Sequence, residues 1–451
     1  MSRGRSGPVF WGLVAAVCLS AAVGAADPPK LPGARCSKGQ SNASSEIACE
    51  LAAELAELPR PALVVAGKLD SDTKTRDAAG IVRLLGRVVA GALGEGIRVS
   101  DGPAGLAQAR SRAARTGALV YLRPALRRGQ LEVTADVYPA VGGFWARVRD
   151  PEPSPMMHAF SSRGLDPELR TFLPPVPLVA QHVERAALTT GEPVALACAD
   201  VDGDNASELL VVDRRRITSA RVRKRRVVAL ATAQWADLGS VAPSPLRQPI
   251  AGVMAVSDRW VVGLTDRAES IQLDAALQVT GREPRAIPWA PAGCVDVQAW
   301  YLHGQVRPCF GDGTLTKPGV FDDHLDAVAG ARIVTRRGRP RVTRVGRTSD
   351  RDTAMLVDDD GRKTTLGGVG AGLAVGDLDG DGQPEILSSA PTLDPTADVL
   401  HVRTWLEDGS VVDRYTLPVP DGIRALAICP AESAGIRPVV VATATELWVV
   451  R

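Results

Sequence analysis

The pattern of apolar and polar residues along this chain changes near residue 180. Before it, Ile81, Leu85, Val88 and Ala92 recur at intervals of three to four residues, the spacing that puts side chains on one face of an α-helix. Residues 131–138 instead alternate between apolar and polar side chains, as a half-buried strand does. After residue 180 the helical period is lost, and short apolar runs recur between turns that contain Gly, Asp or Pro. The chain therefore predicts a mixed first part and an all-β second part.

The first part of the chain contains elements in an order typical of a small α/β domain. After one helix come a strand, a helix, a strand, a helix and two strands, and Gly129 supplies a hairpin turn between the last two. This order resembles the amino-terminal α/β domain of Tol–Pal-type translocation proteins and related envelope lipoproteins. The resemblance implies a domain that docks other envelope proteins. The elements are expected at residues 46–58, 62–66, 81–92, 97–99, 106–114, 118–126 and 131–138.

Proline-rich stretches separate the two parts of the chain. Residues 151–155 and 174–177 are rich in proline, which cannot donate ladder hydrogen bonds and so favours connecting segments. We therefore predict an α+β multidomain fold. Its divisions are a signal peptide at residues 1–26, a linker at 27–45, a small α/β domain at 46–150, a Pro-rich connector at 151–180 and an all-β domain at 181–451.

The amino terminus has the composition of an export signal. Arg3 and Arg5 precede an apolar stretch at residues 10–22, and small residues precede Asp27, an arrangement typical of cleaved signal peptides. An uncleaved membrane anchor is the alternative, although the apolar stretch is short for a membrane span. We predict a secreted or periplasmic protein of the cell envelope, without a membrane span after signal cleavage.

The cysteine count agrees with export. Seven cysteines are present, and removal of Cys18 with the signal leaves six, an even number that permits three disulfides. Proximity in the sequence suggests the pairs Cys36–Cys49 and Cys294–Cys309. The sequence has no Cys-x-x-Cys pair, so zinc or redox chemistry is not expected.

Two short segments of the all-β part repeat one acidic pattern. Each has acidic residues at loop positions 1, 3, 5 and 9 and lies between two apolar runs. Carboxylates crowded in this way repel one another unless a cation lies among them, and hard oxygen ligands in a flexible loop suit Ca²⁺. An acidic surface turn without a ligand is the alternative. The predicted ligands are Asp200, Asp202, Asp204, Glu208 and the carbonyl of Ala206 in the first loop, and Asp377, Asp379, Asp381, Gln383 and Glu385 in the second.

A third copy of this segment keeps the apolar residues and loses the acidic pattern. The apolar runs around the second loop recur 53 residues later, where the acidic positions hold Pro430, Glu432, Ala434 and Pro438. A repeat that keeps its apolar residues while it loses its acidic ones is a repeated structural element. The pattern resembles the FG-GAP/VCBS repeats of integrin-α-type β-propellers, whose blades carry such a Ca²⁺ loop between their first two strands. The resemblance implies a β-propeller of roughly five to seven blades over residues 181–451, with Ca²⁺ as a stabilising ion.

Closure of a propeller ring places its first and last blades side by side. Cys198 lies just before the first acidic loop, and Cys429 lies just before the third, decayed copy. We therefore expect a Cys198–Cys429 disulfide that joins the two blades and closes the ring covalently.

The overall composition argues against several partners and reactions. The formal net charge of +2 is close to neutral, so a nucleic-acid partner is not expected. Arginine clusters at residues 214–226 and 336–347 are interpreted as charged strand edges, with an anionic ligand as the alternative. Tryptophans of the β part are assigned to packing, with a sugar-stacking groove as the alternative. The five histidines are scattered, and no hydrolase or metalloprotease motif is present.

These features favour a protein that binds over a protein that catalyses. We predict an exported, monomeric, non-catalytic scaffold whose Ca²⁺-stabilised propeller presents a surface to a protein or glycan ligand at the cell envelope. The alternative is a propeller-type extracellular enzyme, a glycan lyase or hydrolase. Such an enzyme would need several titratable side chains converging in a central pocket, whereas a bare or apolar channel would favour the scaffold.

Overall fold

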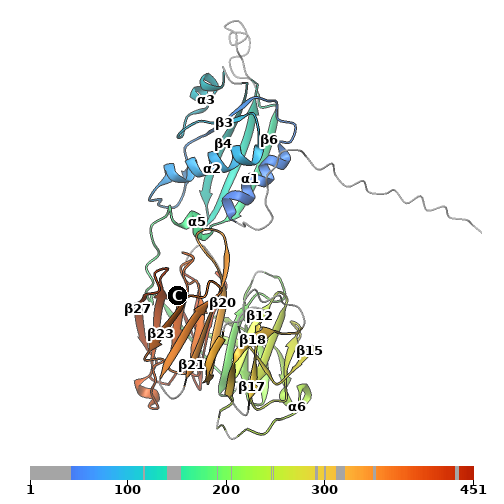
Figure 1. Ribbon diagram of the computed structural model, residues 1–451, viewed down its shortest axis with the longest axis vertical. Helices are drawn as coiled ribbons and strands as arrows, with labels where there is room; N and C mark the ends of the chain where they lie inside the picture. The colour runs from blue at the N-terminus through green and yellow to red at the C-terminus, as the bar shows by residue number, and fades with distance from the viewer. Residues whose placement is uncertain are drawn as a thin grey trace, which may run out of the picture.

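The computed structural model divides into two parts stacked along its longest axis (Figure 1). An α/β domain contains the amino-terminal elements, and a domain built of β-strands contains the rest of the chain. The predicted signal peptide and most of the linker lie outside the described residues. No helix in the described part is long and apolar enough to span a membrane. The structure describes residues 42–451 except 115–116, 140–153, 190, 205, 245, 247, 290–292, 299–300, 311–319, 349–351 and 432–435.

The predicted helices and strands of the α/β domain form in the predicted order, together with two strands that were not predicted. These are α1 (Ala43–Glu54), β1 (Ala62–Ala66), β2 (Asp70–Ser71), α2 (Ala78–Leu93), β3 (Ile97–Val99), α3 (Leu106–Ala113), β4 (Ala118–Arg127), β5 (Gln130–Tyr138) and β6 (Met157–Gly164). The sheet runs β3-β1-β4-β5-β6, with β2 paired to β4. α1 and α2 cover one face, where Leu51, Leu85 and Val120 are fully buried, and α3 covers the other face.

The α/β domain extends further along the chain than residue 150. β6 pairs antiparallel with β5, although residues 151–180 were expected to form a connector. Its alternate residues Ala159 and Ser161 are buried, whereas Phe160 between them is half exposed. The short helix α5 (Pro167–Arg170) follows β6, and its amino end is capped by the Asp166 side chain. The connector is therefore shorter than the proline content indicates, because a strand with few apolar residues lies between the two proline clusters.

The β domain is a propeller with six four-stranded blades among the described residues. Four blades are separate sheets, and the first and last are joined into one eight-stranded sheet by a parallel pairing of Ala187 with Arg226. Six falls within the predicted range of five to seven. The first five blades are β8 (Pro193–Ala199), β9 (Glu208–Asp213), β10 (Arg216–Arg223) and β11 (Arg226–Gln234); β12 (Ala251–Val256), β13 (Arg259–Leu264), β14 (Glu269–Leu273) and β15 (Val279–Pro284); β16 (Ala286–Pro288), β17 (Gly293–Gln298), β18 (Tyr301–Pro308) and β19 (Val320–Leu325); β20 (Ala327–Val334), β21 (Pro340–Thr348), β22 (Thr353–Asp358) and β23 (Lys363–Gly367); and β24 (Leu373–Gly376), β25 (Glu385–Ser388), β26 (Val399–Trp405) and β27 (Val411–Pro418). The sixth contains β28 (Ala425–Ile428), β29 (Val439–Ala442), β30 (Glu446–Val450) and β7 (Val183–Ala187). Two short helices, α6 (Trp235–Leu238) and η1 (Pro395–Ala397), lie in loops.

Two separate parts of the chain close the ring. β7, which precedes the first blade, pairs antiparallel with β30 and so completes the last blade. A disulfide joins Cys198 at the end of β8 to Cys429 after β28, with the two Cα atoms 4.8 Å apart. This confirms the predicted bond between the first and last blades.

A second predicted disulfide, Cys294–Cys309, is also present, and it joins β17 to the residue after β18. Cys49 is disulfide-bonded, and its predicted partner Cys36 lies outside the described residues.

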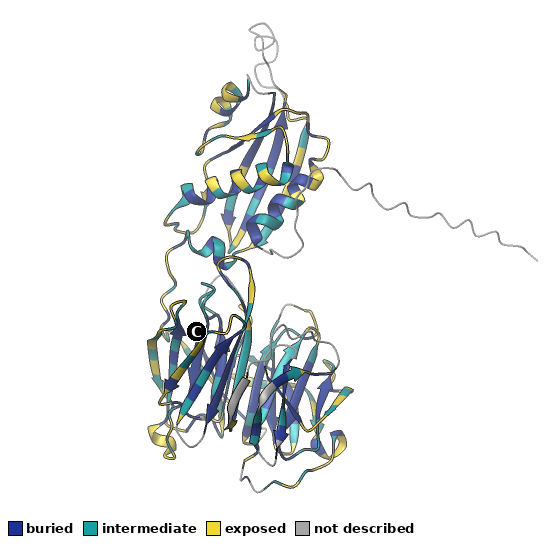
Figure 2. Ribbon diagram, viewed as in Figure 1, coloured by how far each residue is buried: buried dark blue, intermediate teal, exposed yellow. Residues whose placement is uncertain are grey.

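Tryptophans fill the propeller core. Trp260, Trp289, Trp405 and Trp448 are each at most 1% exposed and belong to different hydrophobic clusters between strands. The buried bands that run along each blade in Figure 2 follow from this packing. The assignment of these tryptophans to packing is therefore confirmed for the described residues.

Candidate metal centre

Both acidic loops join the first two strands of a blade, as the sequence predicts. The first connects β8 to β9, and the second connects β24 to β25. Their hairpins share one register, because Ala197 pairs with Leu210 and Ala374 pairs with Leu387 at corresponding positions. The third copy, between β28 and β29, which keeps only Glu432 of the acidic pattern, has the same register. The repeat inferred from the sequence is therefore a repeat of structure.

The two acidic loops also share their internal hydrogen bonds. Glu208 accepts a bond from the Val201 amide at 2.9 Å, and Glu385 accepts the matching bond from Leu378 at 2.6 Å. Position 4 of each loop is a glycine in the left-handed region, Gly203 with φ of 76° and Gly380 with φ of 69°. Since other residues rarely adopt this conformation, these two glycines shape the turn. Gly382 at position 6 has φ of 81°.

Three of the predicted ligands converge in each loop. Oxygen atoms of Asp200, Asp202 and Glu208 lie within 4.8 Å of one another, as do those of Asp377, Asp379 and Glu385. The position-5 acids, Asp204 and Asp381, do not belong to these groups of acidic side chains. The structure therefore brings together positions 1, 3 and 9 of the predicted set, an oxygen-rich arrangement of the kind that holds Ca²⁺.

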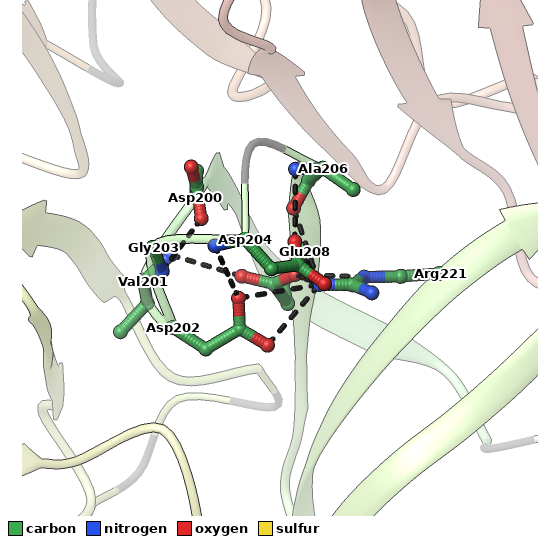
Figure 3. A network of polar contacts seen from close by, with 8 residues as sticks. All are labelled: Asp200, Val201, Asp202, Gly203, Asp204, Ala206, Glu208 and Arg221. Atoms are coloured by element: carbon green, nitrogen blue, oxygen red, sulfur yellow. Dashed lines mark hydrogen bonds and ion pairs between the residues drawn. The ribbon is translucent and has the colours of Figure 1, made fainter.

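In the first loop an arginine lies among the acidic side chains (Figure 3). Nη2 of Arg221, from β10, donates to Asp202 at 3.2 Å, to Asp204 at 2.8 Å and to the carbonyl of Ala206 at 3.3 Å. The same nitrogen contacts Glu208, which also accepts a bond from Nε at 2.7 Å. One guanidinium thus contacts four of the five ligands predicted for this loop. In the sequence this arginine belongs to the basic cluster at residues 214–226, and its contacts with the acidic loop were not predicted.

The second loop has a threonine at the corresponding place. Thr404, on β26, is paired across the strands with Glu385 and donates to its carboxylate at 2.9 Å. Arg414 donates to the threonine hydroxyl at 2.7 Å and not to an acid of the loop. Asp381 is bound from outside the loop by Arg336, at 2.7 Å. The guanidinium groups that form these bonds therefore lie around the loop and not among its converging carboxylates.

The pKa values of acids in the two loops are shifted in opposite directions. In the first, the hydrogen bond from Arg221 lowers the pKa of Asp204. In the second, burial raises the pKa of Asp377 to about 6. Burial also raises the pKa of Asp379 and of Glu385 above their ordinary values. Burial in the second loop thus disfavours the charged form of its carboxylates, an effect that a cation among them would oppose.

Two oxygen atoms of the second loop are buried without a hydrogen bond. They are Oδ1 of Asp377, whose side chain belongs to the converging group, and Oε1 of Gln383. Asp377 is only 4% exposed and Glu385 is fully buried. A buried polar atom without a partner costs about 1–3 kcal/mol, so a cation that coordinates these oxygens would stabilise the loop. Ca²⁺, which takes six to eight oxygen ligands, fits this donor set.

The second loop lies at the junction of the two domains. Arg170, at the end of α5, is close enough to Asp377 and Asp379 for their charges to raise its pKa, although burial lowers it by more. A cavity of about 160 Å³ between the domains is lined by Arg170, Arg336 and Asp379 among others. α5 lies directly above the propeller in Figure 1. The first loop lacks such cover, since Asp202 and Asp204 are 40% and 49% exposed.

The central channel of the propeller is lined by small apolar residues. Its cavity of about 480 Å³ is bordered by the inner strands β8, β12, β20, β24 and β28. Asp326 is the one carboxylate among the lining residues that the structure describes, and it is paired with Arg347 at 2.5 Å. The other charged residues of the lining are Arg332, Arg424 and Arg437.

The last two arginines of the cluster at residues 336–347 are paired with carboxylates. Arg344 contacts Asp359 at 3.1 Å, and Arg347 contacts Asp326 and Asp352. Arg344 is 1% exposed and Arg347 is 8% exposed. These side chains are therefore part of the blade and do not form an open surface for an anionic ligand.

No protein-family model matches this chain, and no curated protein matches it. A solved structure of a DUF4221 family member from Bacteroides vulgatus has 7% identity and a TM-score of 0.37, covering 61% of this chain and 97% of that one. BBS1N in complex with ARL6DN has 10% identity and a TM-score of 0.34, covering 73% and 91%. Virginiamycin B lyase from Staphylococcus aureus has 7% identity and a TM-score of 0.34, covering 59% and 98%.

Similarities this low carry no argument about function. The resemblances to FG-GAP/VCBS repeats and to Tol–Pal-type domains therefore stay inferences from the sequence. The fold class is that of an α+β multidomain protein, in which a small α/β domain precedes a β-propeller.

Proposed function

We propose that this protein is an exported, non-catalytic scaffold whose propeller is stabilised by Ca²⁺ and binds a protein or glycan at the cell envelope. The observation that carries this proposal is the chemistry of the central channel. General acid–base catalysis needs at least one acid and one base within reach of a substrate. Among the described residues, the channel lining has one carboxylate, Asp326, which is bound to Arg347, and three arginines, whose side chains carry donors and no acceptor.

The remaining features support a place outside the cytoplasm. The disulfides Cys198–Cys429 and Cys294–Cys309 form readily in oxidising compartments. The α/β domain would dock the propeller to an envelope partner, and the rigid ring would present the binding surface. An enzyme is the weaker proposal, because the described channel residues do not supply a convergent pair of acid and base.

Calcium is expected to stabilise the propeller against heat. At a Ca²⁺ concentration about a hundred times the dissociation constant, binding to the folded state alone adds about 2.7 kcal/mol. The melting midpoint of the propeller in the full-length protein should then rise by about 5 °C over the value in EDTA. The measurement is a thermal melt followed by tryptophan fluorescence.

Matched variants separate this effect from general salt effects. Asp377→Asn removes a buried acid of the second loop and should abolish the Ca²⁺-dependent rise. Asp258→Asn removes an acid that is 77% exposed in another blade and should leave the rise unchanged. Equal midpoints in Ca²⁺ and EDTA for the unaltered protein would refute the calcium part of the proposal.

The absence of catalysis is tested with the same protein. Glycans that bind on an array are incubated with the Ca²⁺-loaded protein and then analysed by mass spectrometry. Unchanged glycans are expected, and cleaved or unsaturated products would establish the enzyme instead.

A further inference from the structure

The two acidic loops differ at one position that faces the metal ligands. Arg221 and Thr404 occupy the same place in their blades. Thr404 pairs with Glu385, the position-9 glutamate of the second loop. Ala220 pairs with Leu209, so the same register puts the next residue, Arg221, opposite Glu208 of the first loop. Both side chains contact that glutamate, Arg221 at Glu208 and Thr404 at Glu385. The two loops share the backbone bonds within positions 3 to 7, whereas the position-1 acid accepts from the Gly203 amide in the first loop and from the Gly382 amide in the second. The difference in side chain is therefore a difference in what lies among the carboxylates.

We propose that the protein binds one divalent cation per chain, in the second loop, and that Arg221 is a permanent counter-ion that takes the place of the cation in the first loop. This inference rests on the proposed function, since it assumes that the second loop is a Ca²⁺ site. The inference goes beyond the proposed function because it gives the cation to the second loop only, although the two loops have the same acidic pattern.

The contacts of Arg221 are those expected of an occupant of the site. Its Nη2 atom lies 3.4 Å or less from Asp202, Asp204 and the carbonyl of Ala206, and it also contacts Glu208. These oxygens come from positions 3, 5, 7 and 9, where the acidic pattern predicts ligands of an ion. A guanidinium has fixed donors that satisfy several carboxylate oxygens at once. A cation could enter the first loop only if the arginine left it.

The second loop has the opposite features. Thr404 is short and contacts only one oxygen of Glu385, so the space among the acids is not filled from β26. Asp377 is 4% exposed, and its Oδ1 atom has no hydrogen-bond partner. Asp377 is one of the three acids that each place a carboxylate oxygen within 4.8 Å of the others.

Several arginines surround the second loop without donating a hydrogen bond to Oδ1 of Asp377. Arg336 binds Asp381 from the neighbouring blade, and Arg414 binds the hydroxyl of Thr404. Arg170 and Arg437 contribute attractive charge to Asp377. Even so, Oδ1 of Asp377 has no hydrogen bond from any of them. The arrangement contrasts with the first loop, where one arginine bonds directly to three acids.

The test is the number of Ca²⁺ ions bound per chain, measured by equilibrium dialysis of the full-length protein and metal analysis. Calcium modules of exported proteins bind at about 10⁻⁴–10⁻³ M, so the dialysis extends above that range. The unaltered protein should bind one ion. Arg221→Thr gives the first loop the residue found in the second and should bind two. Thr404→Arg makes the reverse exchange and should bind none.

A second pair of variants keeps the proposal testable if an exchanged side chain prevents folding. Asp202→Asn and Asp379→Asn change the same loop position by the same atoms. Asp379→Asn should weaken Ca²⁺ binding at least about tenfold, whereas Asp202→Asn should leave it within about twofold of the unaltered protein.

Each outcome separates the two proposals. No bound Ca²⁺ in the unaltered protein would refute the proposed function itself. Two bound ions in the unaltered protein, or equal losses in Asp202→Asn and Asp379→Asn, would overturn the role of Arg221 and leave the calcium scaffold standing. A folded Arg221→Thr protein that still binds one ion would also overturn it.

Discussion

A protein with serine in place of both Cys198 and Cys429 is expected to lose about 5 kcal/mol of unfolding free energy. The bond joins residues 231 positions apart in the sequence, so its loss frees a very long loop in the unfolded chain. In the chain-entropy account of disulfides, stabilisation grows with the logarithm of loop length. The measurement is guanidinium unfolding of the oxidised protein, followed by the fluorescence of the buried tryptophans.

The second disulfide supplies the matched comparison. Cys294 and Cys309 lie 15 positions apart, and a loop of that length is worth about 3 kcal/mol in the same account. Replacing this pair with serine should therefore cost less than opening the Cys198–Cys429 bond. An equal or larger loss from the shorter loop would show that ring closure by the longer one contributes little.

Much of the fold follows from local sequence patterns. The helix over residues 81–92 was predicted from the spacing of Ile81 and Leu85, and it forms α2 at Ala78–Leu93. Its start is fixed by Asp77, whose side chain accepts a bond from the Gly80 amide, and it ends at Gly94. The propeller was predicted from a repeat whose apolar residues recur in one hairpin register. Periodicity and repeats are signals that a single sequence contains.

Two strands could not be recognised in the same way. β6 has only Ala159 and Ser161 on its buried side, so it lacks a strong apolar alternation. β7 alternates poorly as well, and its partner β30 lies at the far end of the chain. Strands so far apart in the sequence pair only when the whole ring closes, so no short stretch of sequence predicts their pairing.

The acidic residues of the candidate site were predicted from the sequence, but the arginine that neutralises them in the first loop was not. The pattern of acids identified both loops, and the structure brings positions 1, 3 and 9 of each together. The difference between the loops lies on the third strand of each blade, at Arg221 and Thr404. It could have been found by pairing the strands of the β9–β10 hairpin across the turn at Arg214 and Arg215, since this pairing puts Arg221 opposite Glu208. In the sequence alone, Arg221 is one of many basic residues in a row.

Proline at Ala186 is expected to lower the unfolding free energy by at least about 3 kcal/mol. Ala186 lies in β7 opposite Leu447 and is 1% exposed. The ladder bonds can be assigned, because His182 and Arg451 exchange both bonds and the Leu188 amide donates to Thr445. Since such pairs alternate along an antiparallel ladder, the Ala186 amide also donates to β30. Proline removes this donor at the seam of the ring.

Val183→Pro is the control, because its amide belongs to a pair that exchanges no ladder bonds with β30. It should cost much less than Ala186→Pro in the same guanidinium unfolding experiment. When the Cys198–Cys429 bond is also removed, both closures of the ring are weakened, so the loss from Ala186→Pro should differ from its value in the oxidised protein. Equal losses from the two proline variants would mean that the ladder bonds of β7 do not hold the ring closed. A loss from Ala186→Pro that ignores the disulfide would mean that the strand and the disulfide act at independent sites.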